Sequence, residues 1–108
     1  MGRTLQFNVK KQRLTKDRTC DFSHIVAGSV GYLKARFIFC SEWEHKAKAA
    51  SFWAENDDME YAMLLDENNE CVIPTEVLVG KEFTVSVMGA TDRYLIRTNK
   101  IKVKQEVS

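Results

Sequence analysis

Apolar and polar residues alternate in several stretches of the chain. Near the N-terminus Leu5, Phe7 and Val9 alternate with polar neighbours, and residues 83–87 repeat the pattern. A period of two puts successive side chains on opposite faces of a strand, one face buried and one face wet. The same pattern predicts strands at roughly residues 4–10, 12–16, 31–40, 48–54, 59–65, 70–74, 82–89, 93–97 and 99–104.

Turn-forming residues separate these predicted strands. The Asp-Glu-Asn-Asn run at residues 66–69, for example, is typical of the connection between two strands of a hairpin. Many short strands with a turn about every 8 to 12 residues indicate an all-β fold, an antiparallel β-sandwich of the Ig-like kind, with a small barrel as the alternative. The length of 108 residues fits one domain, residues 1–108.

Two segments could form a helical turn. Ser41 with Glu44 three residues later forms a capping-box pattern, but the apolar residues that follow do not continue at helical spacing. We therefore expect a polar bend after Phe39, followed by a strand that includes Trp53. Pro74 favours a turn or a single helical turn directly after it.

The composition sets the size of the core and limits the compartment. Apolar residues make up 44% of the chain, enough for one two-layer core. No stretch approaches the ~20 apolar residues of a membrane-spanning helix, and the first residues lack the apolar region of a signal peptide. The three cysteines, Cys20, Cys40 and Cys71, are an odd number, so we expect reduced thiols in a bacterial-type cytosol and no membrane partner.

The charges are segregated along the chain, although the net charge is only +1. Residues 1–40 hold eight basic and two acidic groups, residues 41–70 hold two and nine, and residues 71–108 hold six and four. If folding keeps these regions apart, the molecule is a dipole suited to head-to-tail association or to a charged partner. We favour the opposite outcome, in which neighbouring strands interleave the signs, because sheets bring distant segments together.

Some residues have side chains that could bind a metal or react. Cys20 with His24, and Cys40 with His45, are spaced like two halves of a thiolate and imidazole metal site. Structural zinc sites usually open with closely spaced cysteines, which are absent here, so we predict no metal and no other cofactor. No nucleophile motif accompanies these residues, and the acidic run at residues 57–70 lacks the spacing of a calcium loop and indicates a solvated hairpin tip. The sequence therefore predicts a protein that is not an enzyme.

Two groups of basic residues suggest nucleic acid as a possible partner. The first is the predicted hairpin at residues 10–18, but single-strand binding also requires aromatic side chains on the same face, and Phe7 belongs to the buried set. The second is Lys100, Lys102 and Lys104, a series typical of an edge strand that resists unwanted strand pairing. We expect no nucleic-acid partner.

The two tryptophans complete the candidate contact residues. Trp53 directly follows Phe52, so in a strand these side chains point to opposite faces, and one of them lies outside or at an interface. Aromatic side chains are enriched in contact patches, although a partly covered surface tryptophan is the alternative. The predicted binding residues are Trp43, Trp53, Lys100, Lys102 and Lys104.

Several stretches resemble a known family of phage proteins. They are LQFNVKKQ at residues 5–12, YLKARFIF at 32–39 leading to SEW at 41–43, and YAMLLDENNECVIP at 61–74 followed by FTVSV at 83–87. They are similar to the N-terminal Ig-like domains of phage tail and baseplate proteins, of the baseplate upper protein type, from phages of Gram-positive bacteria. The likeness covers most of the chain as a pattern of strands and a Leu-Asp-Glu-Asn-Asn turn, and it includes no catalytic signature.

The resemblance implies an adaptor that docks to the tail hub. In such proteins a longer C-terminal region carries fibre or receptor-binding parts; no heptad repeat follows the last predicted strand here, which leaves a domain of a longer protein or a free-standing module. We expect a non-enzymatic module of a phage or prophage particle that binds tail components and forms a homo-oligomer, in the virion or the host bacterial cytoplasm. The alternative is a small phage-encoded inhibitor that binds a host defence protein or its nucleotide signal.

Overall fold

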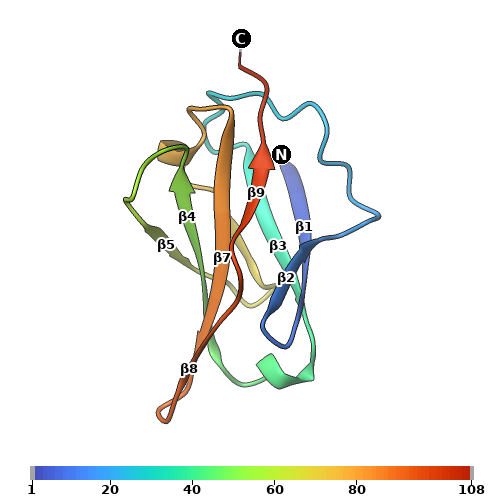
Figure 1. Cartoon of the computed structure of the whole chain (residues 1–108). Coiled ribbons are helices and arrows are strands. Elements are labelled where there is room, and N and C mark those ends of the chain that lie inside the picture. Colours follow the sequence, from blue (N-terminus) through green and yellow to red (C-terminus); the bar gives the residue numbers. More distant parts are fainter. Residues whose placement is uncertain (1, 108) are drawn as a thin grey trace.

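The computed structural model describes residues 2–107, which form two facing β-sheets (Figure 1). The first sheet has the strand order β2–β1–β3–β6. The second has the order β5–β4–β7–β8, with β9 paired to the other part of β7. The elements are β1 (Arg3–Lys10), β2 (Arg13–Lys16), β3 (Leu33–Phe39), the 3-10 helix η1 (Ser41–Trp43), β4 (Ala47–Ala54), β5 (Tyr61–Leu64), β6 (Glu70–Val72), the 3-10 helix η2 (Thr75–Val77), β7 (Glu82–Ala90), β8 (Leu95–Arg97) and β9 (Ile101–Lys104).

This architecture confirms the predicted all-β sandwich, and the two sheets do not close into a barrel. Every predicted strand is present, with ends that differ from the prediction by at most two residues. The bend after Phe39 is a single 3-10 turn, and a second 3-10 turn follows Pro74 as expected. No helix among residues 2–107 is long and apolar enough to cross a membrane.

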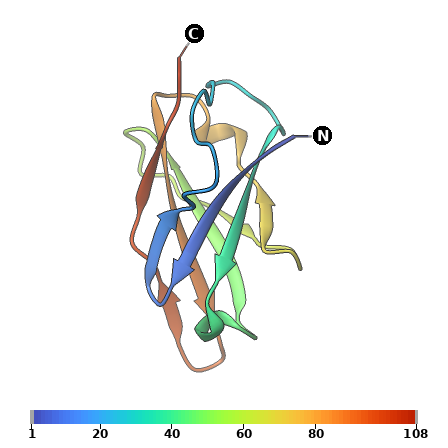
Figure 2. The same cartoon turned by 90° about the vertical axis from the view of Figure 1, so that its right-hand side faces the viewer.

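One strand pairing differs from the antiparallel expectation. β1 and β3 run parallel, from Arg3 opposite Leu33 to Val9 opposite Phe39. Parallel neighbours need a crossover connection of about a dozen or more residues. Residues 17–32 provide it by returning from β2 to the end of the sandwich where β1 begins (Figures 1 and 2). Apolar and polar side chains alternate along a strand in the same way whichever direction the strand runs. The sequence pattern therefore did not reveal that β1 and β3 are parallel.

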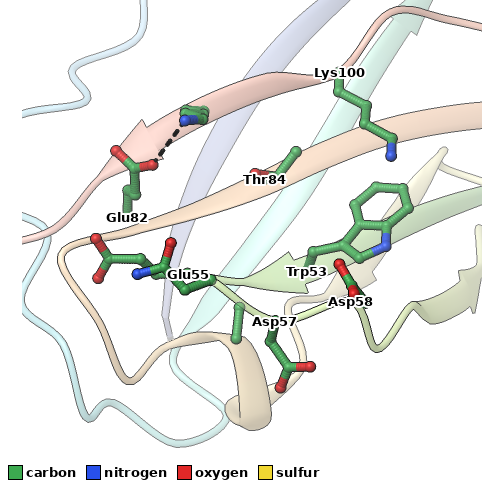
Figure 3. Close-up of a pocket in the computed structure, with 10 residues that line it drawn as sticks. Trp53, Glu55, Asp57, Asp58, Glu82, Thr84 and Lys100 are labelled. Atoms are coloured by element: carbon green, nitrogen blue, oxygen red, sulfur yellow. Dashed lines mark ion pairs between the residues drawn. The ribbon is translucent and has the colours of Figure 1, made fainter.

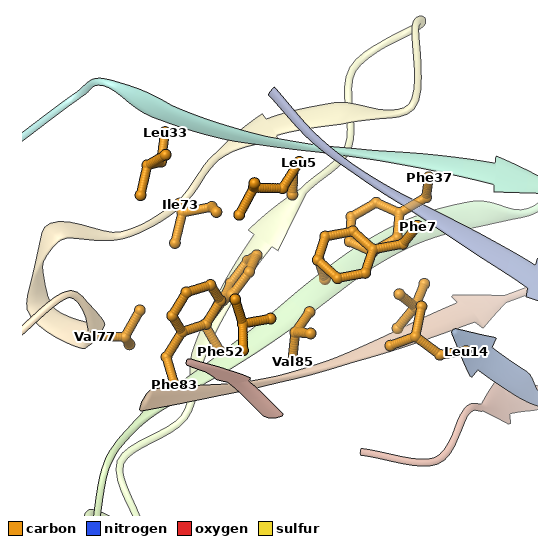
Figure 4. Packing of buried hydrophobic residues seen from close by; sticks show 14 of the residues in the cluster. Leu5, Phe7, Leu14, Leu33, Phe37, Phe52, Ile73, Val77, Phe83 and Val85 are labelled. Atoms are coloured by element: carbon orange, nitrogen blue, oxygen red, sulfur yellow. The ribbon is translucent and has the colours of Figure 1, made fainter. Parts of the chain in front are cut away.

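The core lies between the sheets and consists of the inward half of each alternating strand. Phe7 and Phe37 of the first sheet stack with ring centroids 5.2 Å apart, and Phe52 and Phe83 of the second sheet have centroids 6.3 Å apart (Figure 4). All four side chains are at most 1% exposed. Burying one such side chain contributes about 1.5–3 kcal/mol, so the position of these aromatics determines which face of each strand points inward.

The Asn99 side chain bridges the two sheets on the side of the sandwich where β2 and β9 lie. Asn99 Oδ1 accepts a hydrogen bond from the Leu14 backbone N–H at 2.7 Å, and Asn99 Nδ2 donates to the Leu14 carbonyl oxygen at 3.2 Å. Leu14 lies on β2, at the edge of the first sheet, and Asn99 belongs to the connection between β8 and β9 of the second. The Asn99 amide therefore satisfies the backbone N–H and C=O of Leu14 as a neighbouring strand would. It also links the two sheets.

Candidate binding site

Trp43 is buried, so its prediction as a binding residue is wrong. Its side chain is fully buried because η1 turns the chain back over one end of the core. The ring packs against Phe39 with centroids 5.1 Å apart, and its Nε1–H donates to the Lys11 carbonyl oxygen at 2.8 Å. A buried indole needs such an acceptor. Trp43 closes the core rather than contacting a partner.

Trp53 lies on the outer face of the second sheet. It points away from the core because its neighbours on β4, Phe52 and Ala54, point into it. Thr84 is opposite on β7, and the Lys100 ammonium lies 4.3 Å from the centroid of the Trp53 ring. A cation within about 6 Å of a tryptophan face is attracted by the quadrupole of the ring. The Trp53 side chain is thus partly covered, because Lys100, from a distant part of the chain, lies over one face of its ring.

Trp53 forms one wall of a polar cavity of about 480 Å³ (Figure 3). Lys100 reaches toward the ring from one side and Asp58 from the other (Figure 3). The Lys102 ammonium, also in the cavity, pairs with a Glu82 carboxylate oxygen at 3.1 Å. We call this the Trp53 cavity. Its charged lining consists of Glu55, Asp57, Asp58, Glu82, Lys100 and Lys102.

The turn after β4 holds two of these carboxylates in place. Asn56 adopts a left-handed φ of 58°, which an Asn tolerates better than most residues. Asp57 Oδ1 accepts the backbone N–H of Met59 at 3.0 Å, and Glu55 Oε1 accepts the backbone N–H of Lys81 at 2.8 Å. These bonds tie the side chains to the backbone at the end of the sheet, so the negative charge is fixed beside Trp53.

The charge balance of the Trp53 cavity decides which ligands it suits. Four carboxylates line it against two ammonium groups, and one of those, on Lys102, is already paired with Glu82. An acidic cavity with an aromatic wall attracts a cationic group such as the side chain of a lysine or arginine. It repels the phosphates of a nucleotide. Sequence reasoning named Trp53, Lys100 and Lys102 but missed the carboxylates of this site, because the acidic run that begins at Asp57 indicated only a solvated hairpin tip.

The three predicted lysines lie along one edge of the second sheet. Among residues 2–107, β7 is the only strand that pairs with β9. Ile101 and Val103 point inward, so Lys100, Lys102 and Lys104, which alternate with them, point outward. Lys100 and Lys102 line the Trp53 cavity. Lys104 lines a neighbouring cavity of about 490 Å³. The structure therefore brings together Trp53, Lys100 and Lys102, and places Lys104 next to them.

The fold mixes the segregated charges only in part. Arg36 of β3 pairs with Glu70 of β6 at 2.5 Å, which is the local cancellation that we expected. However, residues 49–80 contain no lysine or arginine, and they include β5 and the turns on both sides of it. The turns on both sides of β5 are therefore acidic, and the nearest lysine is Lys48 of β4, whose backbone is bonded to Leu65 just after β5.

The cysteine and histidine candidates do not form a common site. Cys20 Sγ accepts the Gln6 N–H and Cys40 Sγ accepts the Lys11 N–H, both at 3.3 Å. Gln6 and Lys11 are five residues apart along the line of β1, a distance of about 16 Å. His24 pairs instead with a glutamate near the C-terminus. Within residues 2–107, no cluster of three or more His, Cys, Asp or Glu side chains could hold a metal.

The candidate site therefore has the character of a contact surface, because it combines an aromatic ring, a lysine ammonium beside the ring and carboxylates around it. Comparison of the chain with protein-family models, with curated proteins and with solved structures finds no match.

Proposed function

We propose that this chain is a non-enzymatic protein-interaction module whose Trp53 cavity receives a basic side chain of its partner. The observation that carries this proposal is the Trp53 ring, which holds the Lys100 ammonium at 4.3 Å inside an acidic cavity. The ring offers a rigid apolar surface of the kind enriched in protein contacts. A partner lysine or arginine replaces Lys100 over the ring and is attracted by the fixed carboxylates.

We further propose that the module works in the assembly of a phage tail or baseplate, as the sequence resemblance implies. Two features support this role. The fold is a β-sandwich of the kind that the resemblance predicted, and the candidate site lies on an open sheet face. The expected assembly contains repeated copies of the module.

The inhibitor alternative has two possible ligands, a nucleotide signal and a host defence protein, and the Trp53 cavity does not suit them equally. Capture of a nucleotide signal is disfavoured at the Trp53 cavity, because its carboxylates repel phosphate groups. Capture of a host defence protein would use the same aromatic and acidic groups as a tail component. The identity of the captured protein therefore decides between the two roles.

Affinity capture from a phage-producing lysate tests the proposal, with the immobilised wild-type chain compared with Trp53→Ala. We expect the wild type to retain a tail or baseplate component, and Trp53→Ala to retain at least about tenfold less. Leu95→Ala is the matched control, since Leu95 is exposed on the same sheet face away from the cavity. Retention of a host defence protein would favour the inhibitor. Retention that does not depend on Trp53 would contradict the cavity proposal.

The oligomeric state needs its own measurement, which is size-exclusion chromatography coupled to light scattering. A trimer or larger ring is the expected result for a particle component. A strict monomer that also retains no tail component would contradict the assembly role.

A further inference from the structure

β5 is an edge strand with an open backbone. It pairs with β4, and no other strand among residues 2–107 lies along its second side. The Leu65 N–H donates to the Lys48 carbonyl oxygen at 3.0 Å, just past the end of the ladder. Because antiparallel ladders alternate, Met63 also directs its backbone groups toward β4. Ala62 and Leu64 therefore direct their N–H and C=O groups away from the sheet.

The corresponding edges on the other side of the sandwich are protected, whereas β5 is not. On β2, the backbone of Leu14 is already bonded to the Asn99 side chain. On β9, Lys102 and Lys104 provide the charge by which edge strands resist pairing. β5 contains neither lysine nor proline, and its Leu64 side chain is 81% exposed. An open and apolar edge of this kind is a ready acceptor for another strand.

The charges around β5 select the strand that can bind there. Asp57 and Asp58 precede β5, Asp66 and Glu67 follow it, and no lysine or arginine occurs between residues 49 and 80. If two copies of the chain paired through β5 in antiparallel fashion, the carboxylates at one end would face those at the other. Like charges in opposed positions are destabilising. The edge therefore disfavours its own copy and favours a strand with basic ends.

We propose that β5 binds an extended segment of a partner protein by strand addition, and that this segment has an alternating apolar centre and lysine or arginine at its ends. Main-chain hydrogen bonds to Ala62 and Leu64 supply affinity, and the basic ends face the two acidic turns. Asp57 and Asp58 also line the Trp53 cavity, so the acidic turn before β5 is common to the two proposed contacts. This inference rests on the proposed function and names the chemistry of the partner.

Ala62→Pro removes the outward N–H on which strand addition depends. That N–H faces away from β4, and proline is tolerated on an edge strand at such a position, so the ladder within the chain is kept. Ala62→Val is the matched control because it keeps the N–H. Leu64→Lys is a second variant that adds a charge at a side chain already in solvent. Thermal unfolding of all three full-length variants verifies that they fold.

The probe is a displayed library of random peptides of about ten residues, selected on the Ala62→Val chain. We expect the selected peptides to carry lysine or arginine on both sides of an alternating apolar centre. Ala62→Pro and Leu64→Lys should each bind them at least about tenfold more weakly than Ala62→Val does. In amide NMR spectra of the wild type, the Ala62 and Leu64 amides should gain protection from exchange when the peptide binds.

Several results would overturn this inference. They are a selection that enriches no peptide, enriched peptides without basic ends, and equal binding to Ala62→Pro and Ala62→Val. Sedimentation of Ala62→Val as a dimer and of Ala62→Pro as a monomer would show that a second copy occupies the edge, which also contradicts it.

Trp53→Ala separates this inference from the proposed function. If Trp53→Ala loses the captured partner and Ala62→Pro keeps it, the cavity binds the partner and strand addition fails. If Ala62→Pro loses the partner and Trp53→Ala keeps it, β5 is the docking edge and the role of the cavity fails.

Discussion

The Lys100 ammonium lies 4.3 Å from the centroid of the Trp53 ring, although nearly half of the chain separates the two residues. Lys100 precedes β9 and Trp53 lies near the end of β4, with β7 between these strands. The lysine occupies the ring face that a basic side chain of a partner requires. The unbound protein thus holds its own cation at the proposed contact point.

Replacing Lys100 by alanine should uncover Trp53 with little loss of stability. An exposed cation–π pair contributes about 0.5–1 kcal/mol, so the free energy of unfolding should fall by no more than this. Acrylamide quenching of tryptophan fluorescence should increase, while buried Trp43 supplies an unquenched component. Lys104→Ala is the control, since Lys104 lines the neighbouring cavity. Equal quenching in the two variants would contradict the observed pairing.

Trp43 and Gly89 should show strong energetic coupling. A Cβ added at Gly89 would lie 2.8 Å from Cζ3 of the Trp43 ring, so Gly89→Ala should destabilise the fold by about 1–3 kcal/mol. Trp43→Ala should cost about 3–5 kcal/mol, because it empties a fully buried site. In urea denaturation, the double variant should lose less stability than the sum of the two single losses. Strict additivity would mean that the contact does not limit packing.

Substitution of Asn99 should destabilise the fold even when the new residue is aspartate, which has nearly the same shape. Asn99→Ala leaves the N–H and the carbonyl oxygen of Leu14 without their partner, at a cost of about 1–3 kcal/mol. Asn99→Asp retains an acceptor for the N–H but places a carboxylate beside the carbonyl oxygen, so it should also destabilise. Hydrogen exchange measured at the Leu14 amide should accelerate most in Asn99→Ala. Unchanged protection there would refute the bridging role.

The Cys71 thiol should make stability depend on pH in the alkaline range. Burial, with an added contribution from the Asp66 charge, raises the pKa of Cys71 from 9.0 to about 12. The unfolded chain therefore releases this proton before the folded chain does. The stabilising contribution is complete below about pH 9 and is lost as the pH rises toward 12.

Urea denaturation at neutral and alkaline pH, compared between the wild type and Cys71→Ala, measures this contribution. Wild-type stability should decline more steeply above pH 9, since the variant has no thiol at this position. In the folded wild type, alkylation of Cys71 should remain slow until the pH approaches 12, because the thiolate is the reactive form. If the free energy of unfolding depended on pH in the same way in both proteins, the raised pKa of Cys71 would be contradicted.

The alternation of side chains along the sequence was enough to find the strands and the sandwich. Each inward residue, such as Phe7 or Phe83, is buried because its own strand is amphipathic, and this property is local. The lysines in and next to β9 also indicated that this segment is an edge strand. A row of like charges on the outward positions of a strand is again a local pattern. Sequence reasoning therefore predicted the strands, the core face and one edge.

Only the tertiary structure decided what those elements bring together. The direction of β3 beside β1 depends on the path of residues 17–32, which carry no periodic signal. The burial of Trp43 depends on an acceptor at Lys11, far away in the sequence. The Trp53 cavity likewise combines groups from β4, β7 and β9. Local patterns determine which face of a strand is buried, but a site made of several strands exists only after long-range pairing has set their neighbours.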